Sequence, residues 1–469
     1  MKNDIFHDFN EAFLMDNDEL PEGWSEVPLV TILSSLESGS RPRGGVRGID
    51  SGIPSVGGEH LNEFGGFRFE NIKFIPINFF EKMQRGRIQT GDVLIVKDGA
   101  TTGKVSLVRP DFPYNPAVVN EHVFICRFIQ GIYSPFIFYF LFSQAGQNRI
   151  LENFQGSAQG GINQSFAKNT IVPVAPLKEQ PRIVTRVEAL LSQVNAARDR
   201  LNRVPLIMKR FRQAVLAAAC SGRLTEGEYE SDGNWSYTPF KNVLAKNPQN
   251  GVYLPQSHYG EGIPIIRIDD FHQGVLKSWH SLKRVNSPSS NLDRYVLKEN
   301  DILINRVNSM KHLGKSVLIE NIPEPTIFES NMMRVSLNKN FIYPHFAILY
   351  LQSSIGIEEL RKNAKHAVNQ SSINQKDICT TSIPIPPLNE QQEILHRVNA
   401  LFALADQIEH EVAGATKRTE VLTQAILAKA FCGELVPTEA ELARREGREY
   451  EPVSVLVERI QAGKLGMRK

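Results

Sequence analysis

The chain has 469 residues, of which 41% are apolar and 22% are charged, and its formal net charge is +2. This length predicts about two to four domains with buried cores, and the charge balance excludes both an acidic disordered protein and a histone-like polycation. We expect a cytoplasmic protein without a membrane span, because no run of about 18 apolar residues occurs and residues 1–13 lack a secretory apolar core.

The cysteines and histidines predict no metal site. The four cysteines are far apart and none belongs to a C-x-x-C pair, so we expect reduced thiols rather than a zinc cage or a disulfide framework. The eleven histidines show no spacing typical of metal ligands.

The first globular portion, residues 1–175, is predicted to be mixed α/β. Its β-branched runs at 92–96 and 118–128 are typical of strands and are separated by Gly, Pro and Asn turns. Its loops carry Arg, Lys and amide side chains, which can neutralise phosphates or contact base edges; an ordinary solvated loop is the alternative for each. The candidate DNA-binding residues of this portion are Arg41, Arg43 and Arg47 in a glycine-rich loop, Arg85, Arg87, Lys104, Gln155 and Gln159.

A helical stripe dominates residues 176–224. Apolar or small residues recur there in alternating steps of four and three, which is typical of a coiled-coil seam. An amphipathic helix lying on its own domain is the alternative. Pro205 interrupts the stripe, so we expect a break or kink near Val204 and a second helical segment beginning at Pro205. The segment is basic, with ten Lys or Arg against three acidic residues, and its outward face could meet phosphates, an acidic protein surface or only solvent. The predicted seam residues are Ile183, Val187, Leu190, Val194 and Leu201.

The second globular portion, residues 225–386, has the same character. Strands are expected at 263–268 and 301–304. Its candidate DNA-binding residues are Asn305, Arg306, Asn308, Lys311, Lys315, Asn369 and Gln370.

A second stripe follows in residues 387–436, and a charged tail occupies 437–469. Gly222 and Gly433, just beyond the two stripes, suit C-terminal helix caps. The tail contains one apolar set compatible with a short docking helix: Val453, Leu456, Val457 and Ile460. The predicted seam residues of the second stripe are Ile394, Val398, Leu401, Ile408 and Val412.

An internal repeat relates the two halves. Trp24-Ser-x-x-Pro28 recurs as Trp235-Ser-x-x-Pro239, and the segment 172–180 recurs as 383–391, both at an offset of 211 residues. The run 91–95 recurs at 300–304 with an offset of 209, which implies small insertions or deletions between these points. The chain therefore consists of two related units, each with a divergent globular part and a better-matched helical part.

No complete catalytic motif is present. The segment 99–104, Gly-Ala-Thr-Thr-Gly-Lys, is one residue short of a phosphate-binding loop and lacks the Ser or Thr that holds magnesium. Asn115-Pro116-Ala117 lacks the second proline and the aromatic residue of an amino-methyltransferase tetrapeptide. The sequence predicts a binding protein rather than an enzyme.

Pro176-Leu-x-Glu179-Gln180 and its repeat at 387–391, each followed by a heptad helix and a Gly-x-Leu, closely resemble the specificity subunits of bacterial type I restriction-modification enzymes. The start Leu20-Pro-Glu-Gly-Trp24 and the run 91–94 match that family too, so the resemblance covers nearly the whole chain.

The resemblance implies two target-recognition domains in a pseudo-twofold arrangement, separated by an antiparallel coiled coil of two long helices. It implies double-stranded DNA, two methyltransferase subunits and restriction subunits as partners. S-adenosylmethionine, ATP and magnesium would belong to those partners, and this chain would bind no cofactor. The recognition domains vary within the family, so no base contact is carried onto a numbered residue here.

These observations support one hypothesis, that two unlike domains held apart by helices read an asymmetric bipartite target, one half-site each. A self-sufficient nuclease or methyltransferase, a stand-alone DNA-binding protein and a coiled-coil adaptor without DNA affinity are the alternatives.

Overall fold

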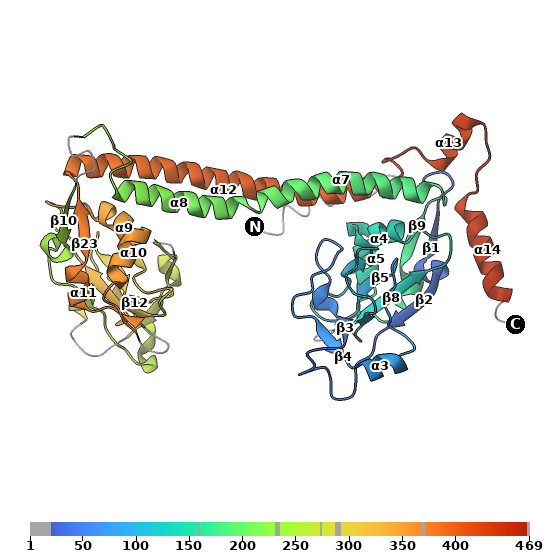
Figure 1. The fold of residues 1–469 in the computed structure, drawn as a ribbon, viewed down its shortest axis with the longest axis horizontal. Helices are drawn as coiled ribbons and strands as arrows, with labels where there is room; N and C mark the ends of the chain where they lie inside the picture. Colours follow the sequence, from blue (N-terminus) through green and yellow to red (C-terminus); the bar gives the residue numbers. More distant parts are fainter. Residues whose placement is uncertain are drawn as a thin grey trace. The chain divides into compact units, whose positions relative to one another are not determined.

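The computed structural model describes residues 20–156, 160–229, 235–272, 274–286, 292–366 and 371–466. The chain forms two compact units (Figure 1). The first unit comprises residues 1–201 and 415–469, and the second unit comprises residues 202–414. Each unit therefore combines one globular portion with parts of both long helical segments.

The first unit contains two sheets besides the terminal ribbon. An antiparallel sheet has the order β2-β8-β5-β6, and a smaller sheet has the order β4-β3-β7 with β3 and β7 parallel. The strands are β2 (Leu33–Ser38), β3 (Ile53–Val56), β4 (Lys73–Ile75), β5 (Val93–Val96), β6 (Val105–Leu107), β7 (Val118–Val119) and β8 (Val123–Phe128). The helices of this globular portion are α2 (Leu29–Ile32), α3 (Ile77–Lys82), α4 (Ser134–Phe142), α5 (Gln144–Leu151) and α6 (Phe166–Asn169).

The second unit repeats both sheets. Its larger sheet has the order β11-β20-β16-β18, and its smaller sheet has the order β15-β12-β19 with β12 and β19 parallel. The strands are β11 (Gln249–Asn250), β12 (Tyr259–Ile266), β15 (Lys283–Val285), β16 (Ile302–Asn305), β18 (Ser316–Leu318), β19 (Ile327–Phe328) and β20 (Met332–Val335). Short strands and helices complete the unit: β13 (Phe271–His272), β14 (Val275–Leu276), β17 (Val307–Asn308), β21 (Lys365–His366), β22 (Ser371–Ser372), α9 (Pro344–Gln352), α10 (Ser354–Arg361) and α11 (Gln375–Thr380).

A two-stranded ribbon closes each globular portion with the same register. In the first unit β1 (Ser25–Pro28) pairs with β9 (Ile171–Val174), so that Ser25 lies opposite Val174. In the second unit β10 (Ser236–Pro239) pairs with β23 (Ser382–Ile385), so that Ser236 lies opposite Ile385. The sequence offset of 211 residues is therefore a structural repeat, and the predicted mixed α/β class is confirmed.

Pro205 breaks the first helical segment as predicted. Helix α7 (Glu179–Leu201) ends two residues before α8 (Val204–Cys220), which carries the proline in its first turn. A proline is tolerated there because the first N–H groups of a helix have no intrahelical partner. The second segment has no proline, and α12 (Leu388–Phe431) is one continuous helix.

Within each unit the helices run antiparallel and pack together. In the second unit Arg212 of α8 pairs with Asp406 and Glu409 of α12 at 2.8 and 3.0 Å. Thr225, which follows α8, donates to Glu390 at the start of α12 at 2.8 Å. In the first unit α7 lies beside the end of α12, and the two helices share one hydrophobic cluster (Figure 1). The predicted antiparallel pairing is confirmed.

The seam is continuous with the domain cores rather than separate from them. In the first unit residues of α7, α12 and α4 belong to one cluster, in which Phe136 and Phe140 lie 5.2 and 5.3 Å from Phe431 between ring centroids. Five of the predicted seam residues are buried, namely Ile183, Val187, Val194, Ile394 and Val398. The other five are half-buried: Leu190, Leu201, Leu401, Ile408 and Val412.

The tail folds back onto the first unit. Helix α13 (Glu439–Glu446) begins with a Thr438 cap, and α14 (Val453–Gly466) buries Val453 and Leu456 in the core, with Val457 and Ile460 packed against it. The docking helix predicted from this apolar set is confirmed. Within the described residues no helix is long and apolar enough to cross a membrane.

Candidate nucleic-acid interface

The glycine-rich loop leaves β2 through a very close backbone crossing. A Cβ on Gly39 would lie 1.7 Å from the carbonyl oxygen of Val119, so only glycine fits. Gly251 occupies the same place in the second unit, where a Cβ would lie 2.2 Å from the carbonyl oxygen of Glu329. In both units the loop is thereby placed beside the turn that follows the short strand β7 or β19.

A chain of charged groups joins three loops of the first unit. Arg41 in the glycine-rich loop pairs with Glu121 in the turn after β7, with 2.8 Å between Nε and Oε1. The imidazole of His122 lies 3.4 Å from the same carboxylate and 2.5 Å from Asp98 in the loop after β5. Lys97 lies 4.0 Å from the other oxygen of Asp98. Basic and acidic side chains thus alternate along the surface formed by these loops.

The amide-rich segment of the first unit lies against the loop after β5. Asp98 forms an isolated bridge with Gly161, and the Ile162 amide donates to the Lys97 carbonyl at 2.7 Å. Gln155 also pairs with Gly161 through the backbone. The structure therefore brings together the loop after β5 and the amide-rich segment, whose paired residues Asp98 and Gly161 are 63 positions apart in the sequence.

The second unit repeats this junction with different side chains. Strand β17 after β16 pairs with β22, so that Asn308 lies opposite Ser371, and the Ile373 amide donates to the Arg306 carbonyl at 2.9 Å. Lys311 and Lys315 lie in the same hairpin, on either side of His312. Burial first, then Lys315 and Lys311, lower the pKa of His312.

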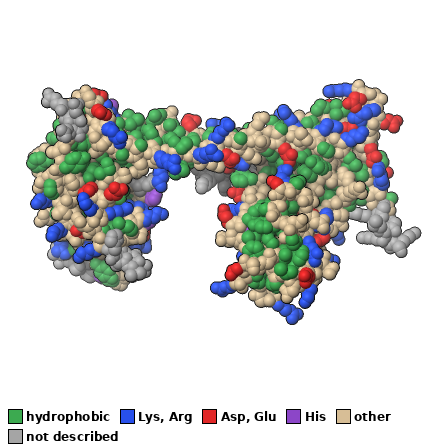
Figure 2. All heavy atoms as spheres, viewed as in Figure 1, with side chains coloured by type: hydrophobic (Ala, Val, Ile, Leu, Met, Phe, Trp, Pro, Cys, Tyr) green, Lys and Arg blue, Asp and Glu red, His purple; other side chains and the backbone are tan. Residues whose placement is uncertain are grey.

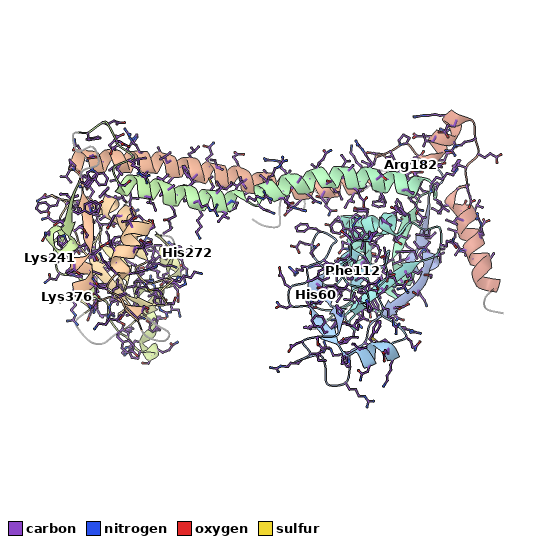
Figure 3. All side chains as sticks on the ribbon, viewed as in Figure 1. His60, Phe112, Arg182, Lys241, His272 and Lys376 are labelled. Carbon is purple, nitrogen blue, oxygen red and sulfur yellow. The ribbon has the colours of Figure 1, made fainter. Side chains whose placement is uncertain are left out.

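Several buried polar atoms of this hairpin have no hydrogen-bond partner among the described residues. They are Nδ2 and Oδ1 of Asn305, Nε of Arg306, Nδ1 of His312 and Oγ of Ser316. Burial lowers the pKa of Arg306, whose Nη1 donates to the Ser330 carbonyl at 3.1 Å. His272 lies exposed on the same unit (Figure 3). The hairpin thus encloses several donors and acceptors whose hydrogen-bonding capacity is not used by the described residues.

The remaining predicted contact residues fall into three groups. Arg43, Arg47 and Arg85 are exposed. Arg87 and Lys104 form hydrogen bonds within the first unit. Arg87 donates to the Phe80 carbonyl at 3.0 Å, and Lys104 donates to the Leu61 carbonyl at 3.2 Å. Three predicted residues lie outside the described residues: Gln159, Asn369 and Gln370.

Sequence reasoning missed the turn between β7 and β8. The apolar run 118–128 reads as one strand, but the Asn120 side chain accepts the His122 amide at 2.9 Å and closes a turn within the run. Asn before a polar pair is the signal that could have identified this turn. Glu121 and His122 consequently lie in a turn at the candidate interface rather than in a strand. Figure 2 shows acidic and basic side chains interspersed over the visible surface.

The family of the chain emerges from comparison with known proteins. Residues 21–205 and 237–413 each match the family described as type I restriction modification DNA specificity domain. The chain is 30% identical to the type I restriction enzyme StySPI specificity subunit of Salmonella potsdam, over 90% of this chain and 91% of that protein. It is 29% identical to the EcoKI specificity subunit of Escherichia coli K12 over the same shares.

Solved structures show the same fold. One such chain comes from a structural study of complex assembly and conformational transition in the type I R-M system. It superposes with a TM-score of 0.68 at 21% identity, and the match covers 89% of this chain and 100% of that one. The HsdS subunit from Thermoanaerobacter tengcongensis superposes with a TM-score of 0.54 at 21% identity, over 89% of this chain and 99% of that one. The chain therefore belongs to the type I restriction-modification DNA specificity family.

Proposed function

We propose that this chain is the DNA sequence-specificity subunit of a type I restriction-modification system and that each unit reads one half-site of an asymmetric target. One observation carries the proposal: the two units have the same sheets and the same loop junction, but the side chains at that junction differ. Direct readout depends on donors and acceptors presented to base edges, so equal scaffolds with unlike loops suit unlike half-sites.

In this proposal the chain binds and positions but does not catalyse. Two methyltransferase subunits and the restriction subunits would be its protein partners, and S-adenosylmethionine, ATP and magnesium would be bound by them. Each unit would hold one methyltransferase over an adenine of its own half-site, and that base must leave the stack before it can react.

Binding of the assembled complex to DNA tests the proposal. The chain is purified with its cognate methyltransferase subunits, and binding to a pool of random duplexes is followed at several salt concentrations. We expect selection of one bipartite sequence and an affinity that falls as salt rises. Equal binding to all sequences would contradict the proposal, and absence of DNA binding would favour an adaptor.

The same preparations test whether the chain is catalytic. The purified chain alone is incubated with DNA, magnesium and S-adenosylmethionine, and we expect neither cleavage nor methyl transfer. Activity of the chain alone would show that it is an enzyme.

A further inference from the structure

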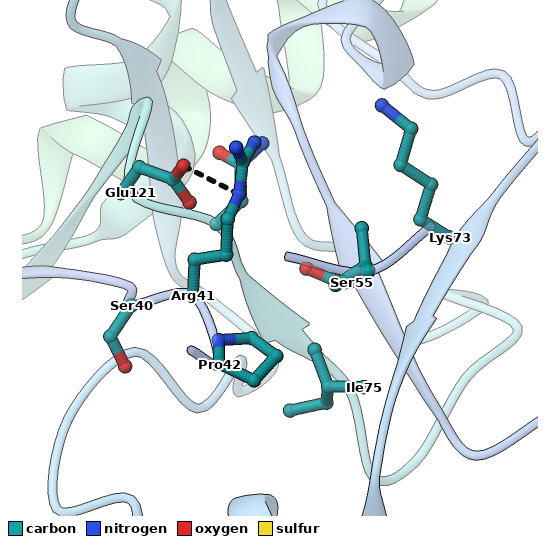
Figure 4. Close-up of a pocket in the computed structure, with 9 residues that line it drawn as sticks. Ser40, Arg41, Pro42, Ser55, Lys73, Ile75 and Glu121 are labelled. Carbon is teal, nitrogen blue, oxygen red and sulfur yellow. Dashed lines mark ion pairs between the residues drawn. The ribbon is translucent and has the colours of Figure 1, made fainter. Parts of the chain in front are cut away.

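One pocket of the first unit combines two cations, Arg41 and Lys73, with the anion Glu121 at the candidate interface, and Lys73 is paired with Glu59 at 3.1 Å. It is lined by residues of the glycine-rich loop, of β3, of β4 and of the turn after β7, and Arg41 lies beside Glu121 in it (Figure 4). The side chains of Arg41 and Glu121 are 47% and 29% exposed, so the pair is accessible at the surface yet held by its surroundings. The positive φ values of Gly44, Gly45 and Gly48 give the loop that carries Arg41 turns that other residues rarely adopt.

The pair has unused hydrogen-bonding capacity. Arg41 meets Glu121 through Nε, and the described residues supply no hydrogen-bond partner for its two terminal nitrogens. Oε1 of Glu121 is shared by Arg41 and His122, whereas Oε2 is a buried atom without a hydrogen-bond partner among the described residues. A buried acceptor without a donor is costly, so turning the Glu121 side chain outward to meet a ligand donor would give this oxygen a partner.

The carboxylate of Glu121 favours a contact with a base edge over a contact with a phosphate. A phosphate offers only negatively charged acceptors, and Glu121 beside Arg41 would repel it. A G·C pair offers both kinds of group in the major groove: O6 and N7 of guanine accept, and N4 of cytosine donates. An arginine fork matches the guanine and a carboxylate matches the cytosine, so a base-pair edge suits this pair better than the backbone does.

We propose that Arg41 and Glu121 together read one G·C base pair of the first half-site, with Arg41 on guanine and Glu121 on cytosine. This inference rests on the proposed function and assigns specificity-determining residues to it. By strand alignment the second unit has Tyr253 and Ser330 at the corresponding positions, and Tyr253 is 79% exposed. The second unit lacks this donor and acceptor pair at those positions, so its half-site is read by other groups.

The test uses the complete complex with methyltransferase subunits and a duplex pool in which every half-site position is randomised. Wild type is compared with Arg41→Ala, Glu121→Ala and Arg43→Ala, and Glu451→Gln serves as a control that removes a carboxylate from an exposed ion pair in the tail. Arg43 is the matched comparison because it lies two residues from Arg41 in the same loop and is exposed.

We expect Arg41→Ala and Glu121→Ala to lose discrimination for one and the same G·C position by about 5- to 150-fold, while the second half-site is read as before. The unchanged second half-site shows that the variants are folded. Arg43→Ala should weaken all sequences equally and reduce the salt slope by about 1, as a phosphate contact does. Glu451→Gln should leave the motif and the affinity unchanged.

Three results would overturn the inference: an unchanged motif in Arg41→Ala, relaxation at different positions in the two variants, or a uniform loss of affinity without a change of motif. A wild-type complex without any sequence preference would instead refute the proposed function, so the two failures are distinguishable.

Discussion

Gln180 and Gln391 show at the residue scale why the Glu-Gln motif occurs twice. Gln180 donates to the Ala175 carbonyl and accepts the Tyr133 amide at 2.8 and 2.9 Å. Gln391 makes the equivalent bonds, donating to the Pro386 carbonyl and accepting the Tyr343 amide, both at 2.8 Å. Each buried amide therefore fixes the start of a long helix to the strand before it and to the helix of its own globular portion.

Replacing this glutamine should destabilise the unit that contains it. We expect Gln391→Ala to lower the free energy of unfolding by about 1–3 kcal/mol, because a buried N–H and a buried carbonyl lose their partners. Gln392→Ala is the matched control, since Gln392 is exposed and its loss should cost within about 0.5 kcal/mol. Urea unfolding followed by circular dichroism measures both, and equal losses would show that the buried amide has no such role.

Glu439 gives the tail a pH-dependent attachment. Its carboxylate is 2% exposed and pairs with Arg182 and Arg448 at 2.6 and 2.7 Å. Burial alone would raise the pKa of Glu439, but the hydrogen bonds from Arg182 and Arg448 lower it below the usual 4.5. A carboxyl group with a lowered pKa in the folded state stabilises above its unfolded pKa, and this contribution is lost as the pH falls through the folded pKa.

We therefore expect the tail to detach more readily in acid. Hydrogen exchange of the α14 amides, corrected for intrinsic rates, should show protection that is constant at neutral pH and falls as the pH drops below the usual glutamate pKa of 4.5. Glu439→Gln should weaken protection at neutral pH and flatten this dependence. Glu446→Gln is the control, because its carboxylate pairs with the same Arg448 but is 54% exposed. An unaltered pH profile in Glu439→Gln would assign the dependence to other groups.

Side-chain partners were the least predictable feature at this scale. The exposure of Arg43 and Arg47 could be predicted, because the glycine-rich composition of this segment indicates a surface loop. The anchoring of Lys104 on Leu61 and the pairing of Arg41 with Glu121 join residues that are 43 and 80 positions apart. Such partners depend on how strands align, and that alignment is not encoded locally.

At the scale of elements, apolar period and proline placement gave the reliable predictions. The stripes predicted helices that pack together, and Pro205 predicted the break that separates α7 from α8. The run 118–128 was misjudged as one strand because both flanks of its turn are apolar and buried. The bulge between Leu33 and Ser35 and the short strands of the second unit have no such periodic signal.

The first helical segment has a proline where the second has a threonine, and exchanging these two residues tests whether the proline position explains the break. Thr416 in α12 occupies the position of Pro205, so Thr416→Pro places a proline inside a continuous helix and should cost about 3 kcal/mol. Pro205→Thr should change stability by less than about 1 kcal/mol, because the first turn of α8 does not require the proline. Urea unfolding at 222 nm distinguishes them, and equal costs would mean that the break in the first segment has another cause.

For the whole molecule, the repeat predicted two similar units before any coordinates, and the equal registers of β1-β9 and β10-β23 confirm it. The repeat did not predict the loops between these strands, because insertions and deletions change the sequence offset between the two units in that region. Helix α12 contributes residues to both units. From this continuity we propose that the helices act as a spacer and set the gap between the two half-sites.

Lengthening the spacer should lengthen the gap. Seven residues inserted after Gly414 in α12, together with seven after Asn202, add about 10 Å of helix, which corresponds to roughly three base pairs. Selection from a pool with variable gaps should show this shift. The same insertion after Gly227, an exposed turn residue, should leave the preferred gap unchanged. An unaltered gap in the double insertion would refute the spacer.

Methylation mapping of a genome tests the central claim most directly. The chain is expressed with its methyltransferase subunits in a host without other adenine methyltransferases, and every modified adenine is located by single-molecule sequencing. We expect one motif made of two short, unlike half-sites separated by a fixed number of unspecified bases, with one modified adenine in each half-site. A single contiguous motif, or two identical half-sites, would contradict it.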